Sequence, residues 1–120
     1  MDSKIRCRWC GSDELYQTYH DLEWGNPEHR DEALFELLIL EGFQAGLSWI
    51  TILKRREAFR EAFAQFDYHA LANWSNEQLE AQMQNELIIR NRLKISAVRT
   101  NAQAFIKIQE KFGSFNQYIW

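Results

Sequence analysis

A single carboxylate, Glu41, falls where the sequence pattern predicts a buried helix face. Residues 33–50 read ALFELLILEGFQAGLSWI. Four side chains with the helical spacing i, i+3, i+4 and i+7 share one face: Leu34, Leu37, Leu38 and Glu41. Glu32 and Glu36 fall on the opposite side, which we expect to face solvent. An unpaired buried carboxylate is costly, so either the chain turns at Gly42 and leaves Glu41 in solvent, or Glu41 has a chemical function.

Aromatic residues gather in a second stretch, LYQTYHDLEWG, which contains Tyr16, Tyr19, His20 and Trp24. Tyr16 and Tyr19 are three residues apart, so in a helix they share a face with His20 beside them. The chain has five Trp and 14% aromatic residues. Two explanations stay open on this spacing alone: an aromatic cluster that seals one end of a helical bundle, or a binding pocket lined by rings.

The segment EGFQAGLSW predicts a tight connection between two helices, bracketed by Gly42 and Gly46. It places Glu41 at the C-terminus of the first helix and Trp49 at the N-terminus of the next. A carboxylate at a helix C-terminus is disfavoured by the helix dipole. An exposed last-turn Glu41 and a core Trp49 would explain the pattern equally well.

Basic residues surround a predicted helix start in ELIIRNRLKISAVRTNA: Arg90, Arg92, Lys94 and Arg99. Backbone N–H groups at such a start, flanked by cations, suit a phosphate oxygen. With the short apolar turn at residues 87–89, the segment resembles a helix-hairpin-helix, a common anchor for the DNA backbone. Leu87 stands where that motif usually has glycine, and a solvated basic face is the alternative.

Candidate metal ligands occur near the N-terminus. Cys7, Cys10 and His20 have suitable chemistry for zinc, but a structural zinc site needs four ligands. His29 and His69 are the other histidines, and their spacing matches no common zinc module. The sequence therefore predicts free thiols or part of a metal site, rather than a structural disulfide within CRWC.

Length and composition favour one soluble domain over residues 1–120 with a real core, since 46% of the residues are hydrophobic. The net charge of −3 argues against attachment to nucleic acid by bulk charge, although a local basic face remains compatible with it. We see no secretory signal and no apolar run near the ~20 residues of a membrane span. We therefore expect a reduced, cytoplasmic protein without a membrane partner.

The periodicity predicts helices throughout and no strands, which indicates an all-α bundle. Residues 1–30 read as irregular. A helix over residues 32–41 begins after the cap Asp31 and stops at Gly42, and a second begins at Ser48. The second helix is expected to bury the following side chains: Trp49, Ile52, Leu53, Phe59, Phe63 and Phe66.

Capping signals define the remaining elements. Ser75 and Gln78 form a capping box for a third helix over residues 76–84. A fourth helix ends at Gly113 and is expected to bury five side chains: Ile95, Val98, Ala102, Phe105 and Phe112. Residues 114–120 read as the start of a fifth helix, so we expect the chain ending at Trp120 to be a fragment.

Five segments together resemble the type I bacterial 3-methyladenine DNA glycosylases: RCRWC, LYQTYHDLEWG, LILEGFQAGLSWITILKRRE, FAQFD and IIRNRLKISAVRTNAQAF. The resemblance runs from Cys7 to Trp120 in order and spacing. YHDxEWG combined with LEGxQAGLSW is specific to that family. The combination favours the functional explanations over the structural ones given above for each motif alone.

The resemblance implies a helix-hairpin-helix glycosylase that flips 3-methyladenine out of alkylated double-stranded DNA and hydrolyses its N-glycosidic bond. Free 3-methyladenine is released and the strand is not cut. Glu41 matches the family's pocket carboxylate, its catalytic residue, which accepts hydrogen bonds from the base. Other positions match as a group: Tyr16, Tyr19 and Trp49 as stacking and hydrogen-bonding residues, Trp9 and Trp24 as flanking aromatics, Gln44 or Leu47 in the gap left by the base, and Arg90, Arg92 and Lys94 on phosphate.

The resemblance also implies a structural zinc ion, with Cys7 and His20 as two of its ligands. Family members supply a further His and Cys from a C-terminal stretch that this chain lacks, so we expect an incomplete site in a monomer. They also lack the catalytic aspartate of other helix-hairpin-helix glycosylases, which leaves Glu41 as the candidate. The alternative function is a truncated module that binds damaged base or DNA without turnover. A purely structural domain would require the motifs to coincide by accident.

Overall fold

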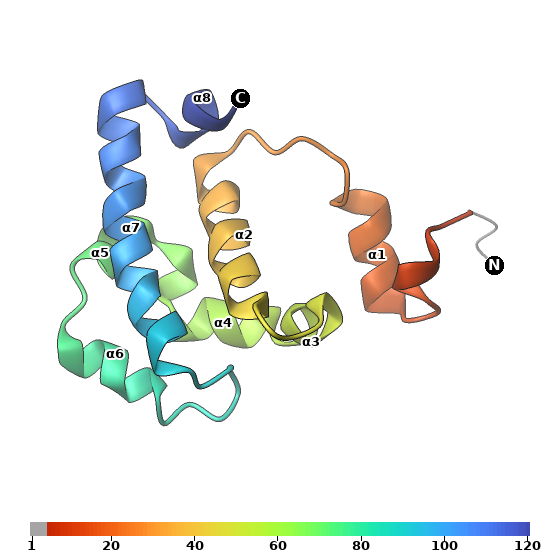
Figure 1. Cartoon of the computed structure of the whole chain (residues 1–120), viewed down its shortest axis with the longest axis horizontal. Helices are drawn as coiled ribbons and strands as arrows, with labels where there is room; N and C mark the ends of the chain where they lie inside the picture. The colour runs from red at the N-terminus through yellow and green to blue at the C-terminus, as the bar shows by residue number, and fades with distance from the viewer. Residues whose placement is uncertain (1–4) are drawn as a thin grey trace.

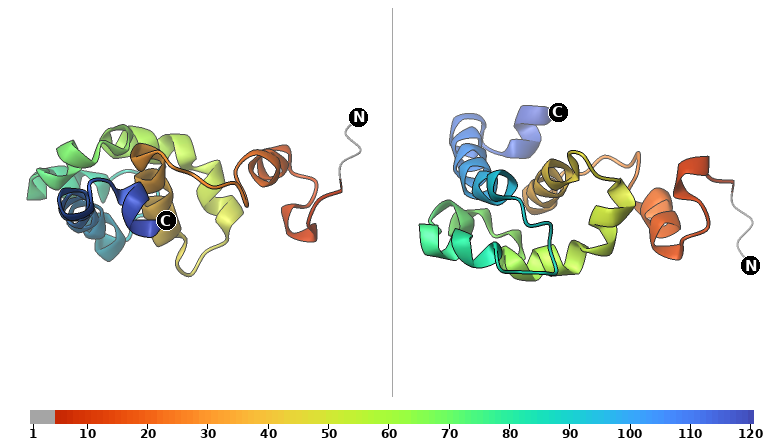
Figure 2. Two further views of the ribbon diagram at one scale, coloured as in Figure 1. Left: turned by 90° about the horizontal axis from the view of Figure 1, so that it is seen from above. Right: turned by 60° about the horizontal axis from the view of Figure 1, so that its bottom comes forward.

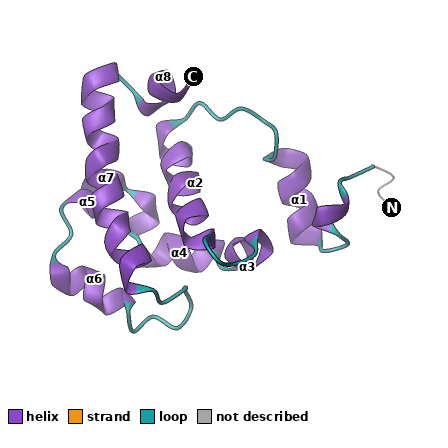
Figure 3. Cartoon of the chain, in the orientation of Figure 1, coloured by secondary structure: helices purple, strands orange, loops and turns teal. Residues whose placement is uncertain are grey.

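The computed structural model describes residues 5–120, and over that range it is helical with no strand (Figures 1 and 3). The all-α prediction is confirmed. The elements run in the order η1 (Arg8–Cys10), α1 (Glu14–Leu22), α2 (Asp31–Gln44), α3 (Trp49–Lys54), α4 (Arg56–Ala62), η2 (Ala64–Phe66), α5 (Tyr68–Ala72), α6 (Asn76–Gln82), α7 (Arg92–Phe112) and α8 (Phe115–Ile119). Within residues 5–120, none of these helices has the length and apolar character needed to cross a bilayer.

The bundle is built around α2 and α7, with α1 and η1 set apart at one end of the molecule (Figures 1 and 2). Its extents are 48 × 36 × 21 Å, so the molecule is elongated and flat. Aromatic rings dominate the core. Phe35 contacts Phe105 at a ring-centroid distance of 5.1 Å, and Phe43 contacts Phe59 at 4.7 Å. These contacts join α2 to α7 on one side and to α4 on the other.

Helix α2 differs from the prediction at its C-terminal end. Gly42 lies inside the helix, which continues to Gln44. The chain leaves the helix through Ala45 and then Gly46, whose φ of +83° is a left-handed conformation that glycine adopts without strain. Asp31 also differs from the prediction, because it is the first helical residue and Arg30 holds the N-cap position.

The buried face of α2 is not the one that the leucine spacing predicts. The face turned to the core carries Phe35, Ile39 and Phe43, whereas Leu38 is 41% exposed and Glu41 is exposed. Between residues 33 and 40 every residue except Glu36 is apolar, so periodicity alone did not distinguish the two faces. Glu36, expected in solvent, is the buried carboxylate, and it is 9% exposed.

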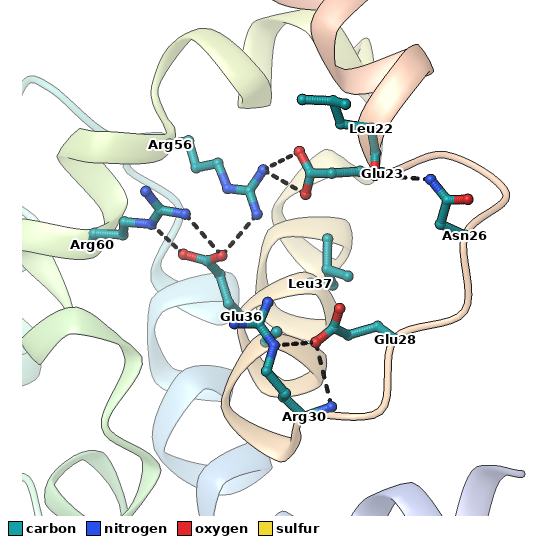
Figure 4. A pocket seen from close by; sticks show the side chains of 10 residues that line it. Leu22, Glu23, Asn26, Glu28, Arg30, Glu36, Leu37, Arg56 and Arg60 are labelled. Atoms are coloured by element: carbon teal, nitrogen blue, oxygen red, sulfur yellow. Dashed lines mark hydrogen bonds and ion pairs between the residues drawn. The ribbon is translucent and has the colours of Figure 1, made fainter.

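Glu36 is buried because two arginines of α4 reach it (Figure 4). The Nη2 of Arg56 donates to Glu36 at 2.8 Å, and Arg60 pairs with both of its oxygens. Burial alone would raise the pKa of Glu36, but the hydrogen bonds from Arg60 and Arg56 outweigh it, so the pKa is lowered. Arg56 also donates to Glu23, 2.8 Å away at the end of α1. This cluster is named here the α2–α4 ion network.

The single helix predicted after Ser48 is broken into α3, α4 and η2. The first break is at Arg55, with φ −105° and ψ 8°. The second lies at residues 64–66, which all have φ between +52° and +58° although none is glycine. The side chains predicted to be buried here are buried: Trp49, Ile52, Leu53, Phe59, Phe63 and Phe66.

Residues 1–30 are less irregular than predicted, since α1 and η1 lie among those described. Asp13 accepts a hydrogen bond from the Tyr16 amide at 3.1 Å, which caps α1. Asp67 caps α5 in the same way, and this short helix was also not predicted.

The capping signals later in the chain are confirmed. Ser75 and Gln78 make the predicted capping box at the start of α6, although this helix ends at Gln82. Gly113 ends α7 with φ +90°. Phe112 is the exception, because it is 40% exposed at the last turn of α7 rather than part of the core. The predicted fifth helix is α8.

Asp31 holds α8 against the start of α2. Its Oδ2 accepts from the Phe115 amide and from Gln109 Nε2, and its Oδ1 accepts from the Asn116 amide, at 2.7–2.9 Å. Burial alone would raise the pKa of Asp31, but these three hydrogen bonds outweigh it and lower the pKa below its ordinary 3.8.

We expect Asp31→Ala to lower the free energy of unfolding by about 1–2 kcal/mol at neutral pH, the usual value of a helix cap. Because the folded pKa is depressed, this contribution is complete above the unfolded pKa and is lost as the pH falls through the folded value. Urea denaturation at pH 7 and pH 3 measures it. Glu32→Ala, which removes an exposed carboxylate from the same turn, is the control. An equal effect of Asp31→Ala at both pH values would contradict the assignment.

Candidate functional site

Seven residues line one cavity of about 200 Å³: Trp9, Tyr16, Tyr19, Trp24, Glu41, Gln44 and Trp49. One wall comes from η1 and α1, and the other from the last turn of α2 and the start of α3. The α1 wall exists because Tyr16 and Tyr19 share a helix face. The cavity is named here the aromatic pocket, and it brings together all six residues assigned to catalysis and base binding from the sequence, and Gln44.

The rings of the aromatic pocket contact one another. The Trp9 centroid lies 5.1 Å from Tyr16 and 5.4 Å from Trp24. Tyr19 reaches across to Trp49 at 5.5 Å, which joins the two walls. Trp9 and Trp24 are 41% and 51% exposed, so they form the rim, whereas Trp49 is buried. The result is an electron-rich surface that suits a flat ligand, and a cationic one above all.

Two polar groups of the aromatic pocket, the Glu41 carboxylate and Trp49 Nε1, have no partner among residues 5–120. Glu41 is exposed at the last turn of α2 and makes no hydrogen bond or ion pair with any residue that the structure describes. It faces the pocket rather than the core, so its position on an apolar stripe does not bury it. Trp49 Nε1 is buried and has no acceptor within residues 5–120. Glu41 is therefore accessible to a ligand, whereas Trp49 Nε1 is covered in this structure.

Tyr19 is a hydrogen-bond donor on the α1 wall of the aromatic pocket. Burial raises the pKa of its phenol, and the nearby carboxylates of Glu23 and Glu41 raise it further; the smaller effect of Arg56 is in the opposite direction. A phenol with a raised pKa keeps its proton at neutral pH. Tyr19 can therefore donate to a ligand beside the acceptor Glu41.

The cations predicted to bind phosphate have different environments in the structure. Arg92 is paired with Glu80. Lys94 Nζ donates to the carbonyls of Phe43 at 2.9 Å and Ala45 at 2.6 Å.

Arg99 donates to the Trp74 carbonyl and to Asn76, both at 3.0 Å. Arg90 is exposed, and within the part of the chain that is described it makes no ion pair. The structure thus leaves Arg90 as the cation open to a phosphate.

The apolar and amide residues assigned to DNA contact lie on the α2–α3 side of the aromatic pocket. Leu47 is 40% exposed on the connection between these helices, and Gln44 lines the cavity itself. Leu87, at the hairpin position usually held by glycine, is 63% exposed, and its carbonyl accepts a hydrogen bond from Arg55 at 3.0 Å.

Two of the predicted metal ligands lie next to each other beside the aromatic pocket. The Cys7 amide donates to His20 Nε2 at 3.3 Å, and His20 Nδ1 lies 3.0 Å from the Asp21 carboxylate. Cys10 is buried, and its Sγ is 3.1 Å from the Cys7 carbonyl. Across residues 5–120 no three His, Cys, Asp or Glu side chains converge as a metal site would require. These residues fit part of a zinc site and not a complete one.

Comparison with known proteins decides the family. The family model for methyladenine glycosylases matches residues 9–120. This chain belongs to the methyladenine glycosylase family. Among curated glycosylases, it is 47% identical over 115 residues to a DNA-3-methyladenine glycosylase of Haemophilus influenzae and 46% identical to DNA-3-methyladenine glycosylase 1 of Escherichia coli. Each alignment covers 96% of this chain but 62% of the relative.

Solved glycosylase structures share the fold. A crystal structure of 3-methyladenine DNA glycosylase I superposes with a TM-score of 0.92 at 47% identity, over 97% of this chain and 64% of that one. A second, from Staphylococcus aureus and concerned with 3-methyladenine recognition, gives a TM-score of 0.92 at 39% identity, over 96% and 61%. The chain therefore has the glycosylase fold while spanning under two thirds of these relatives.

Sequence reasoning missed the α2–α4 ion network. Glu23 belongs to the YHDxEWG motif but was given no role, and it pairs with Arg56, which in turn holds Glu36. Arg56 and Arg60 are spaced i, i+4 on one face of a helix, as Figure 4 shows for the side chains themselves. That spacing was the available signal, although no sequence pattern identified the carboxylate that would meet it.

Proposed function

We propose that this chain binds 3-methyladenine flipped out of alkylated double-stranded DNA and hydrolyses its N-glycosidic bond. The observation that carries the proposal is the aromatic pocket, in which rings from two walls meet beside Glu41, a carboxylate without a partner among residues 5–120. Membership of the methyladenine glycosylase family and the relatives' names support the same substrate.

The chemistry suits these groups. A 3-methylated adenine in DNA is a flat cation, which favours a pocket of electron-rich rings beside a carboxylate. Glu41 accepts hydrogen bonds from the base and, with Tyr19 as donor, orients it. The C–N bond breaks with its electron pair going to the cationic base, which leaves neutral; water then adds to the positively charged sugar carbon and loses a proton to the solvent. Flipping costs a few kcal/mol, and less for a damaged base.

On the DNA side, we propose that Arg90 contacts a backbone phosphate, because it is exposed and has no partner among residues 5–120. Leu47 or Gln44 fills the space that the flipped base leaves. Arg92 reaches phosphate only by exchanging its pairing with Glu80. We further propose a monomer in the cytoplasm, a reducing compartment that suits the free thiols of Cys7 and Cys10.

The test is release of free 3-methyladenine from methylated duplex DNA by this chain, measured by chromatography beside a DNA-binding assay. Release supports the glycosylase. The second candidate, a module that binds damaged base or DNA without turnover, is favoured by the 62% coverage of the relatives. Binding without release by a folded sample would establish that candidate, and neither binding nor release would reject both.

For zinc, we propose that Cys7 and His20 would hold the ion, with Asp21 orienting the imidazole as a carboxylate does beside many zinc-bound histidines. Bound zinc would have a structural role.

Two ligands are half of a structural zinc site, so we expect monomer dialysed against a chelator to retain much less than one equivalent of zinc. Metal analysis of the dialysed wild type and of dialysed Cys7→Ser measures the zinc that each retains. Stoichiometric zinc in wild type that Cys7→Ser abolishes would contradict the prediction.

A further inference from the structure

Lys94 joins the start of α7 to one wall of the aromatic pocket. Its side chain extends from the first turn of α7 to the last turn of α2, where Nζ donates to the Phe43 carbonyl at 2.9 Å and the Ala45 carbonyl at 2.6 Å. Its own backbone amide is held by Asn91, 3.1 Å away, which caps α7. Lys94 is therefore fixed at both ends.

The two carbonyls belong to a helix end that needs a cation. The last four carbonyls of a helix have no intrahelical partner, and the dipole makes this end negative. The last turn of α2 contains no basic residue of its own. The closing backbone contact from the Ala45 amide to the Gly42 carbonyl is long, at 3.5 Å. Lys94 supplies the positive charge and the hydrogen-bond donors that this helix end lacks.

The same helix end forms one wall of the aromatic pocket. Glu41 and Gln44 lie on the turn that Lys94 holds, and Trp49 begins α3 only four residues after Ala45. A shift of the Phe43 and Ala45 carbonyls would move Glu41 relative to the rings of α1. The position of the pocket carboxylate thus depends on a residue outside the pocket.

We propose that Lys94 is a positioning residue: it holds the last turn of α2 so that Glu41 and Trp49 face the rings of α1, and it does not bind phosphate. This role rests on the proposed function, because the wall that Lys94 positions belongs to the pocket that we propose binds the base. Arg90 and Lys94 then have different roles. Arg90 contacts DNA, whereas the Lys94 Nζ is hydrogen-bonded to the carbonyls of Phe43 and Ala45.

The test compares Lys94→Met with Arg90→Met in the 120-residue chain. Methionine keeps an unbranched apolar stem but cannot donate. We expect Lys94→Met to speed amide exchange in residues 43–48 by about tenfold, the effect of losing a charge-assisted hydrogen bond, and to weaken binding of free 3-methyladenine similarly, read by Trp fluorescence. The salt slope of DNA binding should stay at the wild-type value.

Arg90→Met should give the opposite result. Exchange in residues 43–48 and free-base binding stay unchanged, while the salt slope of DNA binding falls by about one, the loss of one phosphate contact. Lys94→Arg restores donors and should recover the slow exchange. Recovery by arginine distinguishes the hydrogen bonds from packing of the stem.

Two results would overturn the proposal. One is amide exchange in residues 43–48 of Lys94→Met at the same rate as in the wild type. The other is a salt slope of DNA binding reduced by about one in that variant. Failure of the wild type to bind 3-methyladenine would count against the proposed function instead. The exchange comparison needs neither ligand nor DNA, so it still decides the role of Lys94.

Discussion

We expect Glu41→Gln to slow release of 3-methyladenine by about 10²–10³-fold and to leave the fold intact. Glu41 is exposed at the end of α2 and has no partner within residues 5–120, so the substitution removes no interaction that holds the helices together. It removes the negative charge that we place beside the cationic base. Loss of one such electrostatic group from a catalytic site costs on the order of 10²–10³ in rate. Chromatography of the released base, with circular dichroism of the same sample, measures both expectations.

Glu32→Gln is the matched control for this prediction. It neutralises another exposed carboxylate on the same helix, outside the residues that line the aromatic pocket. A general effect of net charge on DNA binding would appear in both variants, whereas the proposed role appears only at Glu41. Wild-type turnover by Glu41→Gln would remove the catalytic assignment.

Glu36→Gln produces the largest loss of stability that we expect from a single change of charge. Glutamine has nearly the same volume, but it removes the buried charge that Arg56 and Arg60 share and leaves them with only the more exposed carboxylates of Glu23 and Glu57. Breaking a buried ion pair from one side costs about 3–5 kcal/mol, which we reduce to about 2–4 kcal/mol because the Arg60 side chain is 33% exposed. Urea denaturation measures the free energy of unfolding.

Glu57→Gln is the control, because it removes a carboxylate that contacts the same Arg60 from the solvent side, where Glu57 is 79% exposed. An exposed pair of this kind contributes less than about 1 kcal/mol. If both variants lose the same stability, the ion pair at Glu36 has no special value and the cluster acts as an ordinary surface network.

Local signals predicted the ends of several elements correctly. Ser75 with Gln78 and the glycine at position 113 determine caps within a few residues, and such hydrogen bonds form wherever the chain is helical. The breaks after Lys54 and at residues 64–66 carry no such signal. No glycine marks the left-handed turn at residues 64–66, so only packing of the buried rings around it explains why the chain bends there.

The site was predicted better than its surroundings. The motifs that contain Tyr16, Glu41 and Trp49 do meet in one pocket. The sequence misplaced Glu36 because every other residue between positions 33 and 40 is apolar, so the pattern did not show which face meets the core. The assignment of Lys94 to phosphate stays a prediction, because a cation at a helix start looks the same whichever partner it finds. In both cases the tertiary partner matters, and local spacing carries no information about it.

The attachment of α1 has a consequence for how the protein responds to heat. None of the residues of α1 is buried, and the contacts that tie it to the bundle include the Glu23–Arg56 pair and the Tyr19–Trp49 rings. A helix with so little buried surface opens at a lower free energy than the core around Phe43 and Phe105. Warming should therefore separate the two walls of the pocket in a sub-global unfolding step, with base binding lost reversibly while most helical structure persists.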